Sequence, residues 1–169
     1  MQLDGLATPE GPRRGPRLAV EDLSVYEMRG GHTLRRHVDI PPDEALRRVR
    51  AGEQAAGSFT DRRTAQEAVD DAIQAHRHGI AAWLWGPNAS IRYAFVENLR
   101  RVVGSTLSRR DVALGVETPS QATAVRVVLQ PSDELPSGFS VLTAYPTRPH
   151  LGGRRNAARR EHIEEGVTA

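Results

Sequence analysis

Two histidines, His32 and His37, flank a short helical pattern that directly follows the pair Gly30–Gly31. Imidazole is the side chain whose ordinary pKa suits proton transfer near neutral pH, so either residue could act as a general acid or base. On a helix that turns about 100° per residue, the two positions lie roughly 140° apart. We therefore expect that the two histidines do not share one cleft. One would then be catalytic and the other structural. The simpler alternative is that both are packed or surface residues.

Two hydroxyl side chains, Thr143 and Tyr145, lie two residues apart in the last apolar run, GFSVLTAYP. Side chains alternate between the two faces of a strand, so these hydroxyls point the same way. The shared face is predicted to hold Phe139, Val141, Thr143 and Tyr145. Such a pair could bind an anion, or it could bond to neighbouring residues of a half-buried strand.

The other polar residues indicate less chemistry. His76 and His78 in a polar helical stretch, and His150 and His162 near the C-terminus, are expected to be solvated. The chain has no cysteine, HExxH pattern or DxD pair, so the sequence indicates no metal or cofactor and excludes thiolate catalysis and disulfides. Arginine clusters are typical of solvated faces, although their number is compatible with a polyanionic partner. They lie at 35–36, 47–50, 62–63, 100–101 and 109–110.

Helical patterns fill the first half of the chain. A short helix is expected over HTLRRHV, and Pro41–Glu44 begins a second, because proline and acidic residues suit a first helical turn. The longest helix is predicted from an N-cap at Thr60 or Asp61 to Gly86–Pro87, with a bend allowed at Gly79.

After these helices the hydrophobic period changes to two. Runs at 90–97, 99–103, 124–129 and 138–146 predict an antiparallel sheet, most simply a meander. Residues 104–123 are expected to form a surface loop or one further short strand. The order predicts an α+β fold, with short N-terminal helices and one longer helix packed on a curved antiparallel sheet.

The two ends of the chain lack apolar periodicity. We expect a flexible leader at 1–21, a domain at 22–147 and a flexible basic tail at 148–169. No apolar run is long enough to span a membrane, and the N-terminus carries no signal-peptide pattern.

Four segments occur together in an order and spacing that resemble a known family. They are GGHTLRRHV at 30–38, SFTDRRTAQEAV at 58–69, AVRVVL at 124–129 and LTAYPT at 142–147. Together they resemble the bacterial ribonuclease A-like toxin domain, found at the C-termini of contact-dependent growth inhibition (CdiA) and other polymorphic toxins. The resemblance spans roughly 22–147. It implies a kidney-shaped fold similar to pancreatic ribonuclease but without disulfides, and metal-independent cleavage of RNA.

The resemblance also implies a set of site residues. His37, in the His-Val pair, matches the family's catalytic histidine, and Arg48 matches its essential arginine. The family's Thr-x-Tyr matches Thr143 and Tyr145, and His32 is a second-tier candidate in the first motif. Attack by the ribose 2′-OH, which leaves a 2′,3′-cyclic phosphate and a 5′-hydroxyl, needs a base, a proton donor and a cation.

These needs lead to an assignment of roles. His37 is predicted as the general acid/base, and Arg48 as a clamp whose guanidinium fork matches two phosphate oxygens. Thr143 would hydrogen-bond the phosphate. Tyr145 would orient the histidine or the phosphate, pack against a base, or act as the second proton carrier.

The chain departs from the family pattern at two places. Asp39–Ile40 follows His37–Val38 where the family usually continues with Gly-Lys. A carboxylate there predicts a raised His37 pKa, and it favours the alternative function of a catalytically degenerate RNA-binding domain. Residues 90–122 form a longer, Arg-rich stretch than is usual in the family, where substrate preference is expected to be set.

The leading hypothesis is a ribonuclease toxin of interbacterial competition that cuts RNA, with tRNA one candidate, in the cytoplasm of a target cell. A delivery protein or a larger toxin chain would export it, and a cognate immunity protein would cover the cleft. A third interpretation is a protein-interaction domain of the same fold with no nucleic-acid role. It predicts arginine clusters that point in scattered directions, whereas the other two predict a positive groove past His37.

Overall fold

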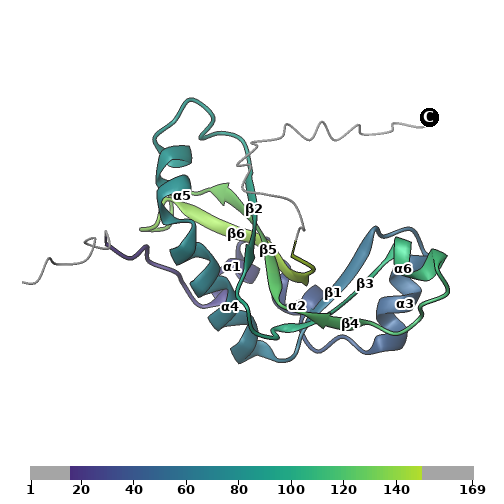
Figure 1. Ribbon diagram of the computed structural model, residues 1–169. Coiled ribbons are helices and arrows are strands. Elements are labelled where there is room, and N and C mark those ends of the chain that lie inside the picture. Colours follow the sequence, from purple (N-terminus) through teal and green to yellow (C-terminus); the bar gives the residue numbers. More distant parts are fainter. Residues whose placement is uncertain (1–15, 150–169) are drawn as a thin grey trace, which may run out of the picture.

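Helices dominate the first half of the molecule and strands the second, in a computed structural model that describes residues 16–149 (Figure 1). The helices are α1 (Leu23–Met28), α2 (Thr33–His37), α3 (Pro42–Arg50), α4 (Arg62–Ala75), α5 (Arg77–Leu84) and α6 (Arg109–Ala113). The strands are β1 (Ala55–Phe59), β2 (Tyr93–Asn98), β3 (Gly104–Ser108), β4 (Ser120–Ala122), β5 (Ala124–Pro131) and β6 (Phe139–Thr147). The α+β class is confirmed. The predicted tail beyond residue 149, with His150 and His162, lies outside the described residues.

The strands form two antiparallel sheets rather than the predicted single meander. One sheet has the order β1-β3-β4 and the other β2-β5-β6. Figure 1 shows them side by side at an angle, with α4 and α5 beside the second sheet and α3 and α6 beside the first. Strand β1 was missed, because AAGSF is too short and too rich in small residues to show a period of two.

The two sheets are joined by one bent ribbon. The chain runs from β2 into β3 and returns from β4 into β5, with bonds from Leu99 N to Thr123 O and from Val103 N to Ala122 O, both 2.9 Å. Residues 99–103, predicted as a strand, are where the ribbon bends, and Arg100 there has a φ of 57°. Residues 104–123, predicted as a loop or one strand, contain β3, α6 and β4.

The long predicted helix begins as expected and then divides. Asp61 caps it by accepting a bond from Thr64 N at 2.7 Å. The break falls at His76 rather than Gly79, since His76 is the C-cap of α4 with a φ of −96° and a ψ of 7°. Its ring stacks on Phe95 with ring centroids 4.1 Å apart and lies 2.9 Å from Glu97. The expectation that His76 is solvated is therefore wrong, while His78 is exposed as expected.

The main core lies between α4, α1 and the β2-β5-β6 sheet, and it reaches into the predicted leader. Its largest buried side chains include Tyr26, Phe59 and Phe139. Leu18 packs against this core and exchanges two hydrogen bonds with the Gln74 side chain, of 3.0 and 2.8 Å. The described part of the predicted leader thus packs on the domain.

A β-bulge in β6 changes which side chains share a face. Val128 pairs with Thr143 and Leu129 with Val141, so Leu142 has no partner of its own in β5. Beyond the bulge Thr143 lies on the face opposite the core, whereas Val141 and Ala144 both belong to the core. Thr143 and Tyr145 share a face as predicted, but the prediction that Phe139 and Val141 share it is wrong, since an extra residue reverses the alternation.

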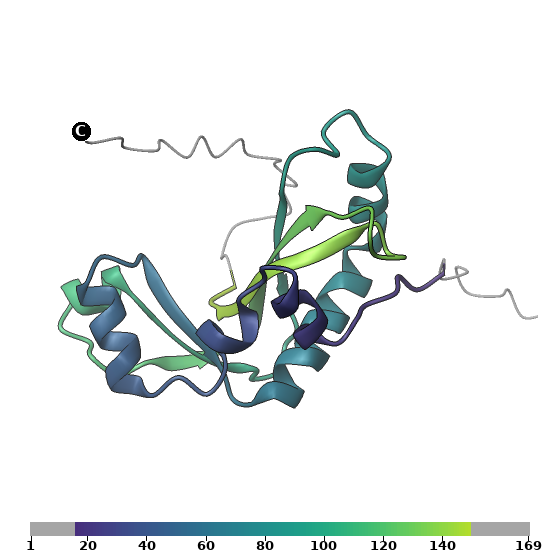
Figure 2. The ribbon, with the colours of Figure 1, turned by 180° about the vertical axis from the view of Figure 1, so that it is seen from behind.

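Two glycines allow the segments around β6 to approach closely. A Cβ on Gly31 would lie 2.8 Å from the carbonyl oxygens of Tyr26 and Val141, and a Cβ on Gly57 would lie 2.2 Å from the carbonyl oxygen of Pro146. Seen from behind in Figure 2, α1 and α2 cross β6 close to the junction of the two sheets. The glycines therefore let α2 and β1 both pack against β6.

Candidate active site

Helix α2 is fixed to β6 at the bulge. The backbone N–H of His32 donates to the Leu142 carbonyl at 3.0 Å, and the Ala144 N–H donates to Thr33 Oγ1 at 2.9 Å. Strand β6 is the last strand of its sheet, so backbone groups on its open edge have no strand partner, and these bonds use two of them. They place the N-terminal end of α2, with His32, beside the last strand, and at the other end of α2 the His37 ring lies beside Tyr145 of the same strand.

A cavity of about 380 Å³ lies where α2, β1 and β6 meet. It brings together four of the five predicted site residues, from segments more than 100 positions apart in the chain. Its walls are formed by His32, Arg36, His37, Glu53, Gln54, Ala55, Thr143 and Tyr145. Arg48 is the predicted residue that does not line it.

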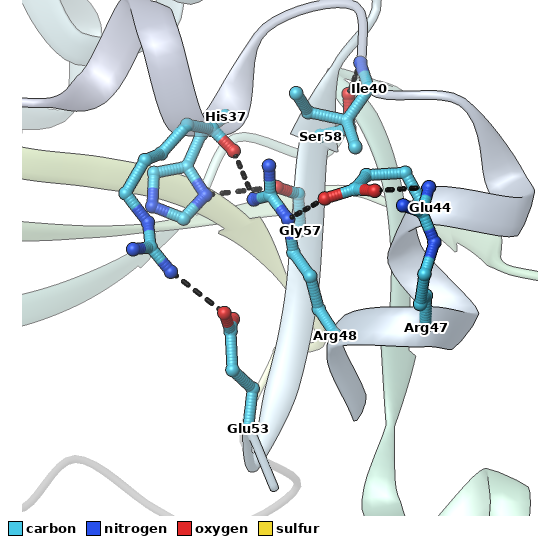
Figure 3. Close-up of polar contacts among 9 residues, drawn as sticks. His37, Ile40, Glu44, Arg47, Arg48, Glu53, Gly57 and Ser58 are labelled. Carbon is cyan, nitrogen blue, oxygen red and sulfur yellow. Dashed lines mark hydrogen bonds and ion pairs between the residues drawn. The ribbon is translucent and has the colours of Figure 1, made fainter. Parts of the chain in front are cut away.

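His37 is held in one orientation in the cavity wall. Its side chain is buried, and Nδ1 lies 3.0 Å from the Gly57 carbonyl oxygen (Figure 3). A carbonyl only accepts hydrogen bonds, so Nδ1 carries the proton and Nε2 of the neutral ring is the basic atom. The Tyr145 ring packs beside the imidazole, with centroids 5.1 Å apart.

Burial lowers the pKa of His37 from its usual 6.5 to about 4. The hydrogen bond to Gly57 opposes this effect, and the positive charges of Arg36 and Arg48 add to it. The expectation that Asp39 raises this pKa is wrong. Asp39 turns away with a φ of 53° and lines a different cavity with Ser58 and Gln121. The degenerate-binder alternative thereby loses the feature that favoured it.

His32 joins the same cavity, contrary to the expectation from helix geometry. It is the N-cap of α2, with a φ of −146°, so the helical angle between positions 32 and 37 does not apply to it. The two imidazole centroids are 6.2 Å apart. Partial burial, and then the charges of Arg36 and Arg35, lower the pKa of His32.

The two predicted hydroxyl residues face the histidines. Thr143 lines the cavity and is 9% exposed, and its Oγ1 is buried with no hydrogen-bond partner among the described residues. Among the described residues, Ser140 Oγ and Arg77 Nε are also buried without a hydrogen-bond partner, but neither residue lines the cavity. A buried hydroxyl without a partner costs about 1–3 kcal/mol, so a group that binds here would recover that free energy.

Arg48 does not line the cavity. Its Nε donates to Glu44 at 2.8 Å and its Nη1 donates to the Arg36 carbonyl at 2.7 Å, and the side chain is 18% exposed (Figure 3). Its charge still acts on His37. The predicted role of Arg48 as a phosphate clamp stays a prediction.

The sequence did not single out two charged residues of the cavity. Arg36 is half exposed, and its Nη2 lies 2.7 Å from Glu53 Oε1, also in the wall. The sequence signal that could have identified Arg36 is its position directly before His37. Because Arg36 belongs to one of several arginine clusters, this signal did not stand out. Glu53 follows α3 in a segment with no recognisable pattern, so only the fold identifies it.

The model of one family, the bacterial CdiA-CT RNAse A domain, matches residues 31–146. The chain belongs to this family. A solved structure of a CdiA-CT/CdiI complex from Y. kristensenii 33638 is also similar, with 30% sequence identity and a TM-score of 0.61, over 69% of this chain and 99% of that one. No curated protein matches the chain. The resemblance inferred from the four sequence segments is thus confirmed.

Most described arginine clusters of this CdiA-CT domain contain an arginine paired with a carboxylate. These pairs connect Arg62 with Asp22, Arg63 with Glu67, Arg101 with Asp71, Arg50 with Glu117, and Arg47 with Glu44. Exposed pairs of this kind contribute little to stability. They indicate solvated faces, the simpler of the two interpretations of the clusters. Arg36 differs from them because it borders the cavity.

Residues 16–149 contain neither a metal-binding cluster of side chains nor a helix suited to span a membrane. No group of three or more His, Asp or Glu residues in this range could hold a metal ion. Within the same range, no helix has both the length and the apolar character that crossing a membrane requires.

The free energy of unfolding of this CdiA-CT domain is expected to fall as the pH drops from about 6.5 to about 4. Over this window the unfolded chain protonates His37 while the folded chain resists protonation, so stability is present above pH 6.5 and is lost toward pH 4. The difference in pKa corresponds to about 3 kcal/mol. Urea unfolding of the wild type and His37→Asn between pH 4 and 7 measures it.

The difference between the free energies of unfolding of the wild type and His37→Asn isolates the contribution of His37. Asp22 and Asp111, whose pKa values are lowered to about 2, lose their contribution in both proteins at lower pH. Parallel curves for the wild type and the variant from pH 7 to 4 would show that burial of His37 does not resist protonation.

Proposed function

We propose that this domain is a toxin endoribonuclease that cleaves RNA by attack of the ribose 2′-OH on the adjacent phosphate. The observation that carries the proposal is the meeting of His37, Thr143 and Tyr145 around one cavity. Membership of the CdiA-CT RNAse A family supports the reaction class.

Each step of transphosphorylation has a candidate residue. Neutral His37 takes the proton of the 2′-OH on Nε2, because the Gly57 carbonyl occupies its other nitrogen. As the 2′-oxygen bonds to phosphorus, Thr143 donates a hydrogen bond to the phosphate, and the arginines beside the site offset its growing charge. The bond to the 5′-oxygen then breaks, which leaves a 2′,3′-cyclic phosphate.

The leaving 5′-oxygen needs a proton. A tyrosine hydroxyl carries its proton at neutral pH, so Tyr145, beside the His37 ring, is assigned as the donor. His32 lines the same cavity and is the second candidate. These steps use side chains alone, in keeping with the metal-independent cleavage that the family resemblance implies.

The biological setting is proposed from the same family. The similar Y. kristensenii domain was solved in complex with CdiI. By analogy, a cognate immunity protein would bind the present domain in the producing cell, and a delivery protein or larger toxin chain would carry it into the cytoplasm of a competitor. tRNA is one candidate substrate there.

The test is to incubate the purified chain with total RNA and with a tRNA pool in EDTA, and to analyse the new ends. Fragments with 2′,3′-cyclic phosphate and 5′-hydroxyl ends are expected, and a His37→Asn preparation controls for contaminating nuclease. Fragments with 3′-hydroxyl ends would overturn the proposed chemistry. Intact RNA together with measurable RNA binding would favour a non-cleaving RNA-binding domain.

A further inference from the structure

Among the arginines of residues 16–149, Arg36 is the one that lines the cavity. It belongs to the last turn of α2, one residue before His37, and it is exposed. Its positive charge lowers the pKa of both His32 and His37, so the guanidinium lies within electrostatic reach of both imidazoles. A phosphate held between these rings would therefore lie within reach of the same charge.

Two of the three Arg48 side-chain nitrogens, Nε and Nη1, donate to other residues of the domain. Beyond its Nε bond to Glu44, Arg48 forms part of a closed set of contacts with two residues of the cavity wall. Arg48 Nη1 donates to Arg36 O at 2.7 Å, Glu53 N donates to Arg48 O at 3.1 Å, and Arg36 Nη2 lies 2.7 Å from Glu53 Oε1. Arg48 thus fixes the backbone that carries Arg36 and the backbone that carries Glu53.

We propose that Arg36 is the guanidinium that contacts the reacting phosphate, and that Glu53 holds it against the cavity wall until a phosphate takes its place. This inference rests on the proposed ribonuclease function. Arg48 is then a positioning residue, which acts through the Arg36 carbonyl and through its charge beside His37. Glu53 is a competitor for the phosphate, because both bind the same guanidinium.

The energetics permit this exchange. The Arg36 and Glu53 side chains are 47% and 34% exposed, so their ion pair is largely solvated and contributes at most about 1 kcal/mol. A phosphodiester offers a guanidinium two oxygens in a matching plane, which one carboxylate contact at a single Nη atom does not. Substrate can therefore displace Glu53 without a large cost in free energy.

The test compares Arg36→Gln, Arg48→Gln and Glu53→Gln, with Arg35→Gln as the matched control. Arg35 lies on the same helix, is exposed and does not line the cavity, so its loss removes one charge without removing the contact. Two readouts are used on the full chain: kcat and KM for RNA cleavage, and the shift of the imidazole NMR signals on titration with inorganic phosphate.

Arg36→Gln is expected to lower kcat/KM about 100-fold and to abolish the phosphate-induced shift, while Arg35→Gln changes each less than about threefold. Glu53→Gln is expected to bind phosphate more tightly and to lower KM, because the competing carboxylate is gone. A folded Arg36→Gln that cleaves RNA and binds phosphate like Arg35→Gln would overturn the proposal, and loss of both in Arg48→Gln alone would make Arg48 the clamp. If the wild type cleaves no RNA, the proposed function fails, but the phosphate titration still tests Arg36.

Discussion

His37→Asn is expected to lower kcat/KM for RNA cleavage about 1,000-fold at neutral pH. Removal of a general base typically costs between about 100-fold and 10,000-fold, and His37 is the buried imidazole whose free nitrogen is fixed by its partner. Asparagine is the informative replacement. Its side-chain amide can donate to the Gly57 carbonyl in place of Nδ1, but it carries no basic nitrogen in place of Nε2.

Steady-state kinetics in EDTA measure this loss, with His78→Asn as the control. His78 is an exposed histidine of α5 outside the cavity, so the control makes the same substitution without touching the site. The control should retain wild-type activity. Retention of more than a tenth of wild-type kcat/KM by a folded His37→Asn would exclude His37 as the base and leave His32 as the next candidate in the cavity.

The sequence predicted best what depends on local pattern. The apolar period and the cap at Asp61 located α4, and period-two runs located β2, β5 and β6 within a few residues. These signals are short in range, since a cap or an alternation involves only neighbours in the chain. Strand β1 shows the limit, because its small residues are buried by partners far away in sequence and carry no pattern of their own.

Four of the five predicted site residues line one cavity, but the sequence did not predict the geometry that brings them together. Helical spacing separated His32 from His37, and only the β6 backbone, through Leu142 O, shows that His32 caps the helix instead of continuing it. In the same way, the closeness of Asp39 to His37 in the sequence predicts an effect on the His37 pKa that the fold does not produce. The positive φ of Asp39, which local pattern does not reveal, directs it to another cavity.

The arginines show why motif matching and geometry can disagree. The match to the family's essential arginine selects Arg48, whereas the residues that line the cavity include Arg36. The two residues are linked by a hydrogen bond from the side chain of one to the backbone of the other. Loss of Arg48 could therefore abolish activity without any contact between Arg48 and RNA, so activity measurements on Arg48 alone do not identify the phosphate ligand.

Thr143→Val is expected to change stability and activity in opposite directions. Valine has nearly the shape of threonine, and the Oγ1 that it removes is buried without a partner among the described residues. The free energy of unfolding should stay the same or rise by about 1 kcal/mol, because no hydrogen bond is lost and one unsatisfied polar group disappears. In contrast, kcat/KM should fall about 100-fold, as it does when one donor to a developing oxyanion is removed.

Thr33→Val provides the matched contrast for stability. Thr33 Oγ1 is also buried but accepts the Ala144 N–H at 2.9 Å, so its removal leaves that N–H unpaired and should lower the free energy of unfolding by about 1–3 kcal/mol. Urea unfolding and cleavage kinetics on both variants test the pair. If Thr143→Val is as destabilised as Thr33→Val and cleaves RNA normally, the Thr143 hydroxyl is structural. A stable but inactive Thr143→Val supports a hydroxyl left unpaired in the free protein because its partner is the phosphate.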